Sequence, residues 1–273
     1  MRHCAAPTGR GLLQLFGGAF LLAVAAAAPA ADAPPPSGLE VMQAVDARPR
    51  GRDQIAHAVW HLIEASGSER VRATRNYWRD AHGKGGVHAQ RLIVFESPPD
   101  VKDTAFLVWS AEDPSGEDQQ WLYLPALRKV RRIATGDRGN SFVGSDFVYD
   151  DLVERTAGAD EHTWLRRESQ DGSPCDVIES RPRTASPYSK RVQWVDRTSR
   201  ITRRIDYYAK SGELEKTLTA AWEQVGGVWV WKRLEMRNLR NGHRTVVEID
   251  GTKVDTGLGE DVFTENTLRL GAP

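Results

Sequence analysis

Val228–Val254 reads VWVWKRLEMRNLRNGHRTVVEIDGTKV, and this stretch decides the fold class. Two runs rich in β-branched and aromatic residues, Val228–Arg240 and His243–Val254, flank the pair Asn241-Gly242. Such side chains favour strands, and Asn-Gly tolerates the positive φ angles of a type I′ turn. The stretch therefore predicts an antiparallel β-hairpin.

The same rhythm extends back along the chain. Asp171-Gly172, Ser211-Gly212 and Gly226-Gly227 also predict tight turns between strands. Thirteen segments have the composition and the turn boundaries of strands: Asp53–Glu64, Glu69–Arg79, Val87–Glu96, Thr104–Ser110, Gln119–Leu124, Arg128–Ala134, His162–Gln170, Cys175–Arg181, Lys190–Asp196, Ile201–Tyr208, Glu213–Gln224, Val228–Arg240 and His243–Val254. Consecutive hairpins in this number predict a mainly β protein whose antiparallel sheet curls into a barrel or half-barrel.

One helix is predicted ahead of the strands. Ser37 and Glu40 have the spacing of a capping box, and apolar residues follow at helical spacing. Pro49 blocks continuation of a helix. The pattern predicts a helix over Gly38–Ala47.

The first residues have the pattern of a signal peptide. Arg2 and Arg10 precede an apolar run from Leu12 to Ala28, and small residues up to Ala30 fit a cleavage site. An uncleaved anchor is the alternative, although the run is short for a membrane span. The expected organisation is a signal peptide over 1–30, a Pro-rich tether over 31–37 and one β domain over 38–273.

Charge and motifs exclude several function classes. The chain has 37 basic and 37 acidic residues, and loss of Arg2 and Arg10 with the signal peptide leaves 35 against 37. This balance gives no overall attraction to nucleic acid. The chain has no Gly-x-Ser-x-Gly elbow, dinucleotide loop or Walker loop. His57 and His61 lack a clear third metal ligand. No enzyme activity, metal or cofactor is therefore predicted.

Several predicted strands are apolar on both faces. In Ala105–Trp109 and Trp121–Leu124 neither alternate set of side chains is polar, and nearly all of the nine tryptophans lie in predicted strands. A sheet with one face in water would alternate. One interpretation is a packed core with helices over the concave face. The other is an apolar cavity for an acyl chain or a similar ligand.

Trp121–Leu152 is the most distinctive stretch and reads WLYLPALRKVRRIATGDRGNSFVGSDFVYDDL. Arg128, Lys129, Arg131 and Arg132 place four cations in five positions. They are interpreted either as contacts for anionic headgroups or an acidic partner, or as charges that keep an edge strand from aggregating.

A long irregular segment follows this basic cluster. Thr135–Asp160 is Gly-rich at its start, and Ser145-Asp146 are expected to cap a short helix that ends near Val153. Long insertions in compact domains are often lids or binding loops. We therefore expect this segment to take part in binding.

The distinctive stretch resembles the signature of the outer-membrane lipoprotein-sorting family related to the periplasmic lipoprotein carrier LolA. The matching pieces are Tyr123–Pro125, Lys129–Arg132, Ser141–Phe147, Tyr149–Leu152, Asp46–Pro49 and the segment around Phe263. The resemblance implies an incomplete antiparallel barrel, covered on its concave face by short helices, with an apolar cavity for lipid. It also implies a periplasmic location.

These observations lead to a hypothesis of a monomeric periplasmic carrier for lipid or lipoprotein acyl chains. Its partner is expected to be an outer-membrane acceptor or an RND-type transporter of the inner membrane. The alternative is a non-enzymatic envelope adaptor that docks such a partner without lipid cargo. The residues expected to line the cavity are Trp109, Trp121, Tyr123, Phe142, Phe147 and Tyr149. The residues expected to contact a headgroup or a partner are Arg128, Lys129, Arg131 and Arg132.

Overall fold

The computed structural model describes residues 35–270, which belong to one compact unit. The predicted signal peptide and the first part of the predicted tether lie outside the described residues. The described part contains the helices α1 (Gly38–Asp46) and α2 (Glu265–Leu270) and several one-turn 3-10 helices. No helix within 35–270 is both long enough and apolar enough to cross a membrane.

Thirteen antiparallel strands form a single sheet. Their bounds are β1 Asp53–Ile63, β2 Glu69–Asp80, β3 Val87–Ser97, β4 Ala105–Ala111, β5 Gln119–Leu124, β6 Lys129–Arg132, β7 Asp160–Gln170, β8 Ser173–Pro182, β9 Tyr188–Asp196, β10 Thr202–Ala209, β11 Leu214–Val225, β12 Val228–Asn238 and β13 Arg244–Val254. All thirteen predicted strands are therefore confirmed, with small differences at their ends.

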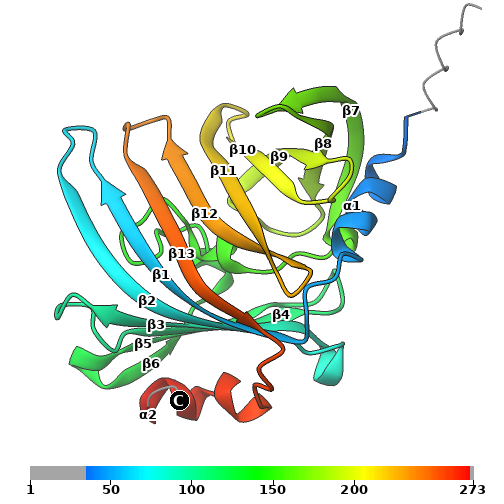
Figure 1. Cartoon of the computed structure of the whole chain (residues 1–273). Coiled ribbons are helices and arrows are strands. Elements are labelled where there is room, and N and C mark those ends of the chain that lie inside the picture. Colours follow the sequence, from blue (N-terminus) through cyan, green and yellow to red (C-terminus); the bar gives the residue numbers. More distant parts are fainter. Residues whose placement is uncertain (1–34, 271–273) are drawn as a thin grey trace, which may run out of the picture. The chain divides into compact units, whose positions relative to one another are not determined.

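The strand order makes the sheet an open half-barrel (Figure 1). It runs β6-β5-β4-β3-β2-β1-β13-β12-β11-β10-β9-β8-β7, so the first and last strands pair in the middle and β6 and β7 are the two edges. The chain must therefore cross from one edge to the other between β6 and β7. We call this connection, residues 133–159, the crossover segment.

Two of the predicted tight turns are confirmed. Asp171 and Gly172 have φ angles of 49° and 77°, and Gly226 and Gly227 have φ angles of 58° and 81°. Each pair joins two strands that end directly beside it. Both residues of a type I′ turn require positive φ, which these pairs provide.

The turn prediction at Asn241-Gly242 was wrong. Gly242 has a φ of 72°, but the φ of Asn241 is not positive. The amide of Asn238 donates to the carbonyl of His243 at 2.9 Å, and this bond closes a loop longer than two residues. Ser211-Gly212 also lies in a longer loop, in which only the glycine has a positive φ.

Helix α1 begins where the capping box predicts. The Ser37 hydroxyl accepts a hydrogen bond from the Glu40 amide at 3.1 Å, and the Glu40 carboxylate accepts one from the Ser37 amide at 2.8 Å. The apolar face of the helix, with Val41 and Met42, packs against β8 and β9. The capping box thus fixes the helix start, and burial fixes which face points to the sheet.

The crossover segment packs into the concave face of the half-barrel. Phe142, Phe147 and Tyr149 are buried in the same hydrophobic cluster as side chains of β1, β3, β4 and β12. The helix predicted from Ser145 was wrong, because only one 3-10 turn forms, over Tyr149–Leu152. The segment takes its shape from tertiary contacts rather than from a helical repeat.

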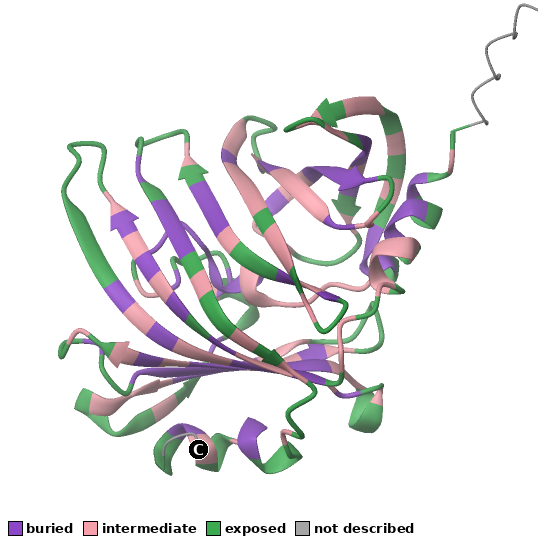
Figure 2. Cartoon of the chain, viewed as in Figure 1, coloured by how far each residue is buried: buried purple, intermediate pink, exposed green. Residues whose placement is uncertain are grey.

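A second cluster lies on the opposite face of β2–β5 and explains the strands that are apolar on both sides. Leu107 and Trp121 pack there against Phe263 and Leu268, which come from the segment that ends in α2. Figure 1 shows α2 outside the curve of the sheet, and Figure 2 shows the buried stretches along these strands. The C-terminal segment, which the sequence did not reveal as a helix, therefore covers the outer face.

Asp53 anchors this C-terminal segment to β1. Its carboxylate accepts hydrogen bonds from the Thr256 hydroxyl at 2.6 Å and from the amides of Thr256 at 2.8 Å and Gly257 at 2.9 Å. Burial by itself would raise the pKa of Asp53, but these hydrogen bonds outweigh it and hold the pKa below its ordinary value. The ionised carboxylate is therefore the form that the fold stabilises.

Replacing Asp53 with asparagine is expected to lower the free energy of unfolding at pH 7 by about 1.5–3 kcal/mol, since bonds to a charged group are lost. Because the folded pKa is lowered, this stabilisation is present above the ordinary pKa of 3.8 and is lost as the pH falls through the folded value. The variant should therefore lose less stability than the wild type on acidification. Urea unfolding between neutral and acidic pH tests this, with the exposed Asp100→Asn as control.

Candidate functional site

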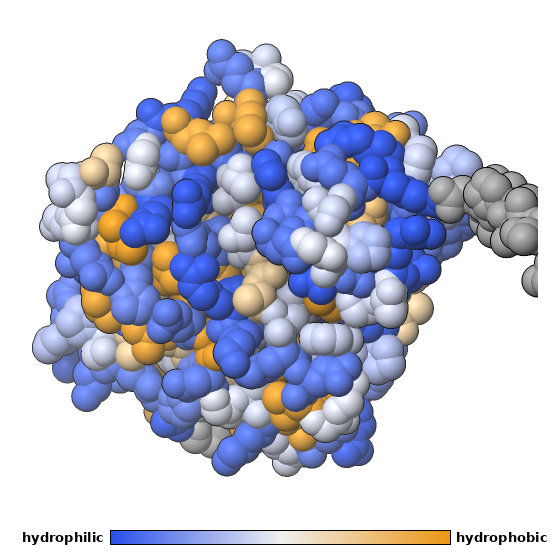
Figure 3. Space-filling model, turned by 45° about the horizontal axis from the view of Figure 1, so that its top comes forward, coloured by the Kyte–Doolittle hydropathy of each residue, from blue (hydrophilic) through white to orange (hydrophobic). Residues whose placement is uncertain are grey.

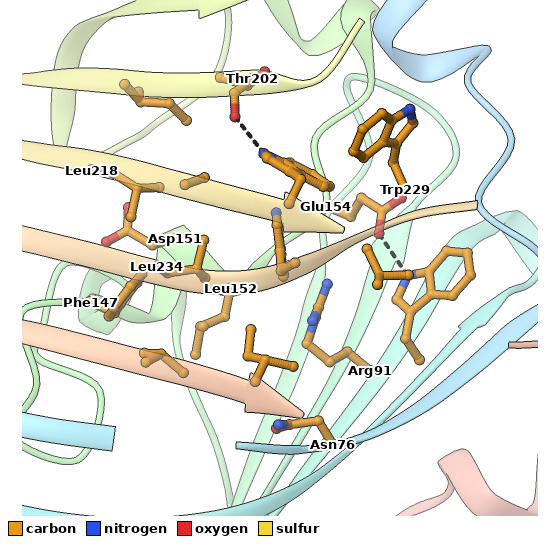
Figure 4. A pocket seen from close by; sticks show the side chains of 18 of the residues that line it. Asn76, Arg91, Phe147, Asp151, Leu152, Glu154, Thr202, Leu218, Trp229 and Leu234 are labelled. Carbon is orange, nitrogen blue, oxygen red and sulfur yellow. Dashed lines mark hydrogen bonds between the residues drawn. The ribbon is translucent and has the colours of Figure 1, made fainter. Parts of the chain in front are cut away.

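A cavity of about 340 Å³ lies on the concave face of the sheet, between its central strands, the end of α1 and the crossover segment. The strands β1, β2, β3, β10, β11, β12 and β13 all contribute side chains to its wall. The volume falls at the lower end of the range for small-molecule sites, about 300–1,000 Å³. Figure 4 shows side chains from these elements directed into one space.

Tryptophans form much of the cavity wall. Five of the nine in the chain line it: Trp60, Trp78, Trp222, Trp229 and Trp231. Aliphatic side chains from the sheet fill the wall between them: Ile93, Ile205, Leu218, Leu234, Val247 and Ile249. On the outer surface drawn in Figure 3, hydrophobic residues form separate patches among hydrophilic ones. The cavity thus gathers a large apolar surface inside the molecule.

Hydrogen bonds hold the indole rings in place. The Nε1 atom of Trp60 donates to the Thr74 hydroxyl at 3.0 Å, and that of Trp222 donates to the Thr202 carbonyl at 3.0 Å. A buried indole N–H usually needs such a partner, and these bonds fix the orientation of the two rings. The wall is therefore organised before a ligand arrives.

The crossover segment supplies the floor of the cavity. Phe147, Leu152 and Val153 line it beside Asp151. The Asp151 carboxylate accepts hydrogen bonds from the Tyr188 hydroxyl at 2.9 Å and from the Val148 amide at 2.9 Å. Burial raises the pKa of Asp151 above its ordinary value, and these hydrogen bonds oppose the rise. This acid belongs to a buried network that holds the floor against the sheet.

The opposite end of the cavity is cationic. Arg50 forms an ion pair with Glu154 and lies 5.6 Å from the ring centroid of Trp78. The Nε1 atom of Trp78 donates to the same carboxylate at 2.7 Å. Arg48 and Arg91 also line this end. Within 35–270, no three His, Cys, Asp or Glu side chains are grouped as ligands for a metal.

The six residues expected to line the cavity lie in different parts of the structure. Phe147 lies in the cavity wall, whereas Phe142 and Tyr149 lie in the packed cluster beneath it. Trp109, Trp121 and Tyr123 lie on the opposite face of the sheet, where the Trp109 indole donates to the Phe263 carbonyl at 2.9 Å. These five residues do not line this cavity, and a part for them in ligand binding stays a prediction.

The physical reason is the two-residue period of a strand. Neighbouring side chains on β4 and β5 point to opposite faces, and both sets are apolar, so the composition does not identify the inner face. The crossover segment buries one set and the C-terminal segment buries the other. Without those partners, the choice between the two sets is arbitrary.

The basic cluster lies away from the cavity. Lys129, Arg131 and Arg132 belong to the edge strand β6, and Arg128 precedes it with a positive φ of 48°. Their side chains are exposed, and Arg131 pairs with Asp137 at 2.7 Å. Charged residues are a common means of keeping an edge strand from pairing with other chains. Contact of this cluster with a headgroup or a partner remains a prediction.

Sequence reasoning missed cavity residues on β11 and β12, among others. Trp222 and Trp231 are direct cross-strand partners in the hairpin closed by Gly226-Gly227. This turn was predicted correctly, so the pairing of the two tryptophans could have been read from it. Arg48 and Arg91 offered no comparable signal, because they are far apart in sequence.

Comparison with known proteins identifies the family. The structure matches that of an outer membrane lipoprotein-sorting protein domain from Vibrio parahaemolyticus with a TM-score of 0.80 and 33% sequence identity, covering 85% of this chain and 98% of that chain. The chain belongs to the outer membrane lipoprotein-sorting protein family. A family model described as an uncharacterized protein matches residues 88–270.

Other solved structures extend the relationship. A DUF1329 family protein from Desulfovibrio piger matches this lipoprotein-sorting family member with a TM-score of 0.80 and 29% identity, covering 85% of this chain and 97% of that chain. A LolA superfamily protein from Nitrosomonas europaea matches at TM-score 0.66 and 18% identity, covering 85% and 99% respectively, and this match shows the shared half-barrel fold. No curated protein matches the sequence.

Proposed function

We propose that this lipoprotein-sorting family member is a periplasmic carrier that holds an acyl chain of a lipid or a lipoprotein in its half-barrel cavity. The observation that carries the proposal is the cavity wall of five tryptophans on the concave face of the sheet. The family relationship supports it, because the protein from Vibrio parahaemolyticus is described as a lipoprotein-sorting domain. The partners would then be an outer-membrane acceptor or an RND-type inner-membrane transporter.

Burial of apolar surface would drive such binding. Each methylene removed from water contributes about 0.8 kcal/mol. A long acyl chain thus gains on the order of 10 kcal/mol before the costs of ordering the ligand are subtracted. Hydrogen bonds already hold the indole rings, so the protein loses less conformational entropy when a ligand binds.

Native mass spectrometry of the mature protein, purified from the periplasm of its own cell, tests the carrier function. We expect a stoichiometric lipid or lipoprotein that is released on unfolding, and organic extraction would then identify it. If the purified protein contains no lipid and also fails to bind fluorescent fatty acids, the result would contradict the carrier function. That outcome would favour the alternative of an envelope adaptor without lipid cargo.

Filling the cavity should abolish this binding. Ala220 on β11 lines the cavity, and the neighbouring Ala221 is exposed. Replacing Ala220 with phenylalanine is expected to weaken binding of a fluorescent fatty acid at least about tenfold, since the new ring occupies the volume that a ligand needs, and tenfold corresponds to only 1.4 kcal/mol. Titrations followed by fluorescence measure the affinity.

Ala221→Phe is the matched control, because it adds the same ring on the other side of the same strand. It should bind the fatty acid as the wild type does. Equal affinities for both variants would show that the ligand lies outside this cavity. Circular dichroism and urea unfolding of both variants establish that they are folded.

A further inference from the structure

Two arginines in the cavity have no hydrogen-bond or ion-pair partner within residues 35–270. Arg48 lies directly after α1, and its Nε and Nη1 atoms are buried without a hydrogen-bond partner among residues 35–270. Arg91 on β3 is partly buried, and no hydrogen bond or ion pair joins it to another described residue. Both side chains line the cavity.

The other arginines of the cavity wall are all paired. Their ion pairs are Arg50–Glu154, Arg155–Asp160, Arg203–Asp196 and Arg204–Asp206. The two carboxylates nearest to the cationic end are also engaged: Glu154 by Arg50 and Trp78, and Asp46 by the Ala157 amide at 2.6 Å. A neutral amide leaves the charge of Asp46 in place, so the three arginines Arg48, Arg50 and Arg91 face two carboxylates at this end, and one positive charge is left over.

Each of the two unpaired arginines stacks on one ring of a neighbouring tryptophan pair. The guanidinium of Arg48 lies 4.7 Å from the ring centroid of Trp222, and that of Arg91 lies 5.3 Å from the ring centroid of Trp231. The two rings are 5.8 Å apart. Stacking on an aromatic face leaves the N–H groups at the edge of the guanidinium available. The hairpin of β11 and β12 thus presents two guanidinium groups together.

Partial burial of these cations has a free-energy cost that no acceptor in the described part of the chain offsets. Burial, together with the nearby charge of Arg50, lowers the pKa of Arg48 and of Arg91 to about 10. Both side chains are still protonated at neutral pH. A buried charge without acceptors is unfavourable, and an anion that supplies them gains strong, charge-assisted hydrogen bonds. Guanidinium groups are well suited to the oxygens of phosphate and carboxylate.

We propose that Arg48 and Arg91 bind the anionic headgroup of the cargo, so that the carrier selects amphiphiles with a phosphate or carboxylate group at one end of an apolar chain. This inference rests on the proposed function, because the acyl chain would occupy the rest of the same cavity. In Figure 4, Arg91 and Glu154 reach the cavity from different elements, beside Trp229. The apolar side chain of Phe147 lies at the other end of the view, so the cavity has a cationic end and an apolar end.

A pair of lipids with the same acyl chain tests the selection. The probes are lysophosphatidylglycerol, which is anionic, and a monoacylglycerol, which is neutral, each below the concentration at which it forms micelles. Affinity is measured by tryptophan fluorescence, since five tryptophans line the cavity, and is checked by native mass spectrometry. We expect the wild type to bind the anionic lipid at least about tenfold more tightly, the effect of one charge-assisted hydrogen bond.

Variants assign this preference to the two residues. In the double variant Arg48→Gln with Arg91→Gln, the affinity for the anionic lipid should fall to that for the neutral lipid, and the affinity for the neutral lipid should stay within about threefold of wild type, well under the tenfold that 1.4 kcal/mol represents. Arg240→Gln, at an exposed arginine that pairs with Glu215 and does not line the cavity, is the matched control and should retain the full preference.

The outcomes separate the two proposals. Equal binding of both lipids by the wild type, or a preference that survives in the double variant, would overturn the headgroup site and leave the carrier function standing. Binding of neither lipid would contradict the carrier function itself. Inorganic phosphate is the third probe: if it binds as tightly as the anionic lipid, the site recognises a free anion and the lipid assignment is wrong.

Discussion

Replacing Phe142 with alanine is expected to lower the free energy of unfolding by about 3–5 kcal/mol, the range for truncating a buried phenylalanine. The side chain is only 1% exposed. Its ring centroid lies 5.1 Å from that of Phe106, 5.8 Å from that of Trp60 and 5.9 Å from that of Tyr149. Phe142 therefore joins the crossover segment to two strands, and its removal leaves a cavity that these rings cannot close.

Urea unfolding measured by circular dichroism and by tryptophan fluorescence gives the change in stability. Leu127→Ala is the control, since Leu127 is 61% exposed, and a change within about 0.5 kcal/mol is expected there. A loss of less than about 1 kcal/mol at Phe142 would be far below that range. It would mean that the crossover segment does not pack into the sheet as described.

Replacing Arg191 with methionine is expected to destabilise the protein by a comparable amount, about 3–5 kcal/mol, because it leaves the buried Asp150 without a cation and Asp160 with Arg155 alone. The Nη2 atom of Arg191 on β9 lies 3.3 Å from the carboxylate of Asp150, and its Nη1 atom lies 3.3 Å from that of Asp160. Burial opposes the charge of Arg191, but the two carboxylates outweigh it and raise the pKa above its ordinary value.

The location of this ion-pair network explains its importance for the site. Asp150 belongs to the 3-10 turn Tyr149–Leu152 of the crossover segment, next to the floor residues Asp151 and Leu152. Arg191 therefore connects the floor of the cavity to the far half of the sheet. We expect the variant to lose lipid affinity together with stability, because the floor is then no longer held in place.

An ion pair whose arginine is exposed, on the neighbouring strand, provides the control for this prediction. Arg181 lies 2.7 Å from Glu179 and its side chain is 54% exposed. Arg181→Met should cost less than about 1 kcal/mol, as is usual for pairs in water. If both variants lost the same small amount in urea unfolding, the network around Arg191 would not carry the stability assigned to it here.

Local patterns were sufficient to predict most of the secondary structure. The capping box of Ser37 and Glu40 located the start of α1, and the Asp171-Gly172 and Gly226-Gly227 pairs located two hairpins. These features depend on residues close together in sequence, whose backbone preferences act without the rest of the fold. The turn at Asn241-Gly242 shows the limit of such reasoning, because a longer loop is closed there by backbone hydrogen bonds.

The sequence by itself determined an antiparallel half-barrel of thirteen strands and the family to which it belongs. Only the tertiary structure decided which side chains face the cavity. Trp121 and Leu122 are adjacent and both apolar, and they are buried under different covering segments on opposite faces. Likewise, Arg48 and Arg91 meet in one cavity because the sheet curves and pairs its first strand with its last. Local propensity cannot encode such contacts, since they form between segments that come together only when the whole sheet folds.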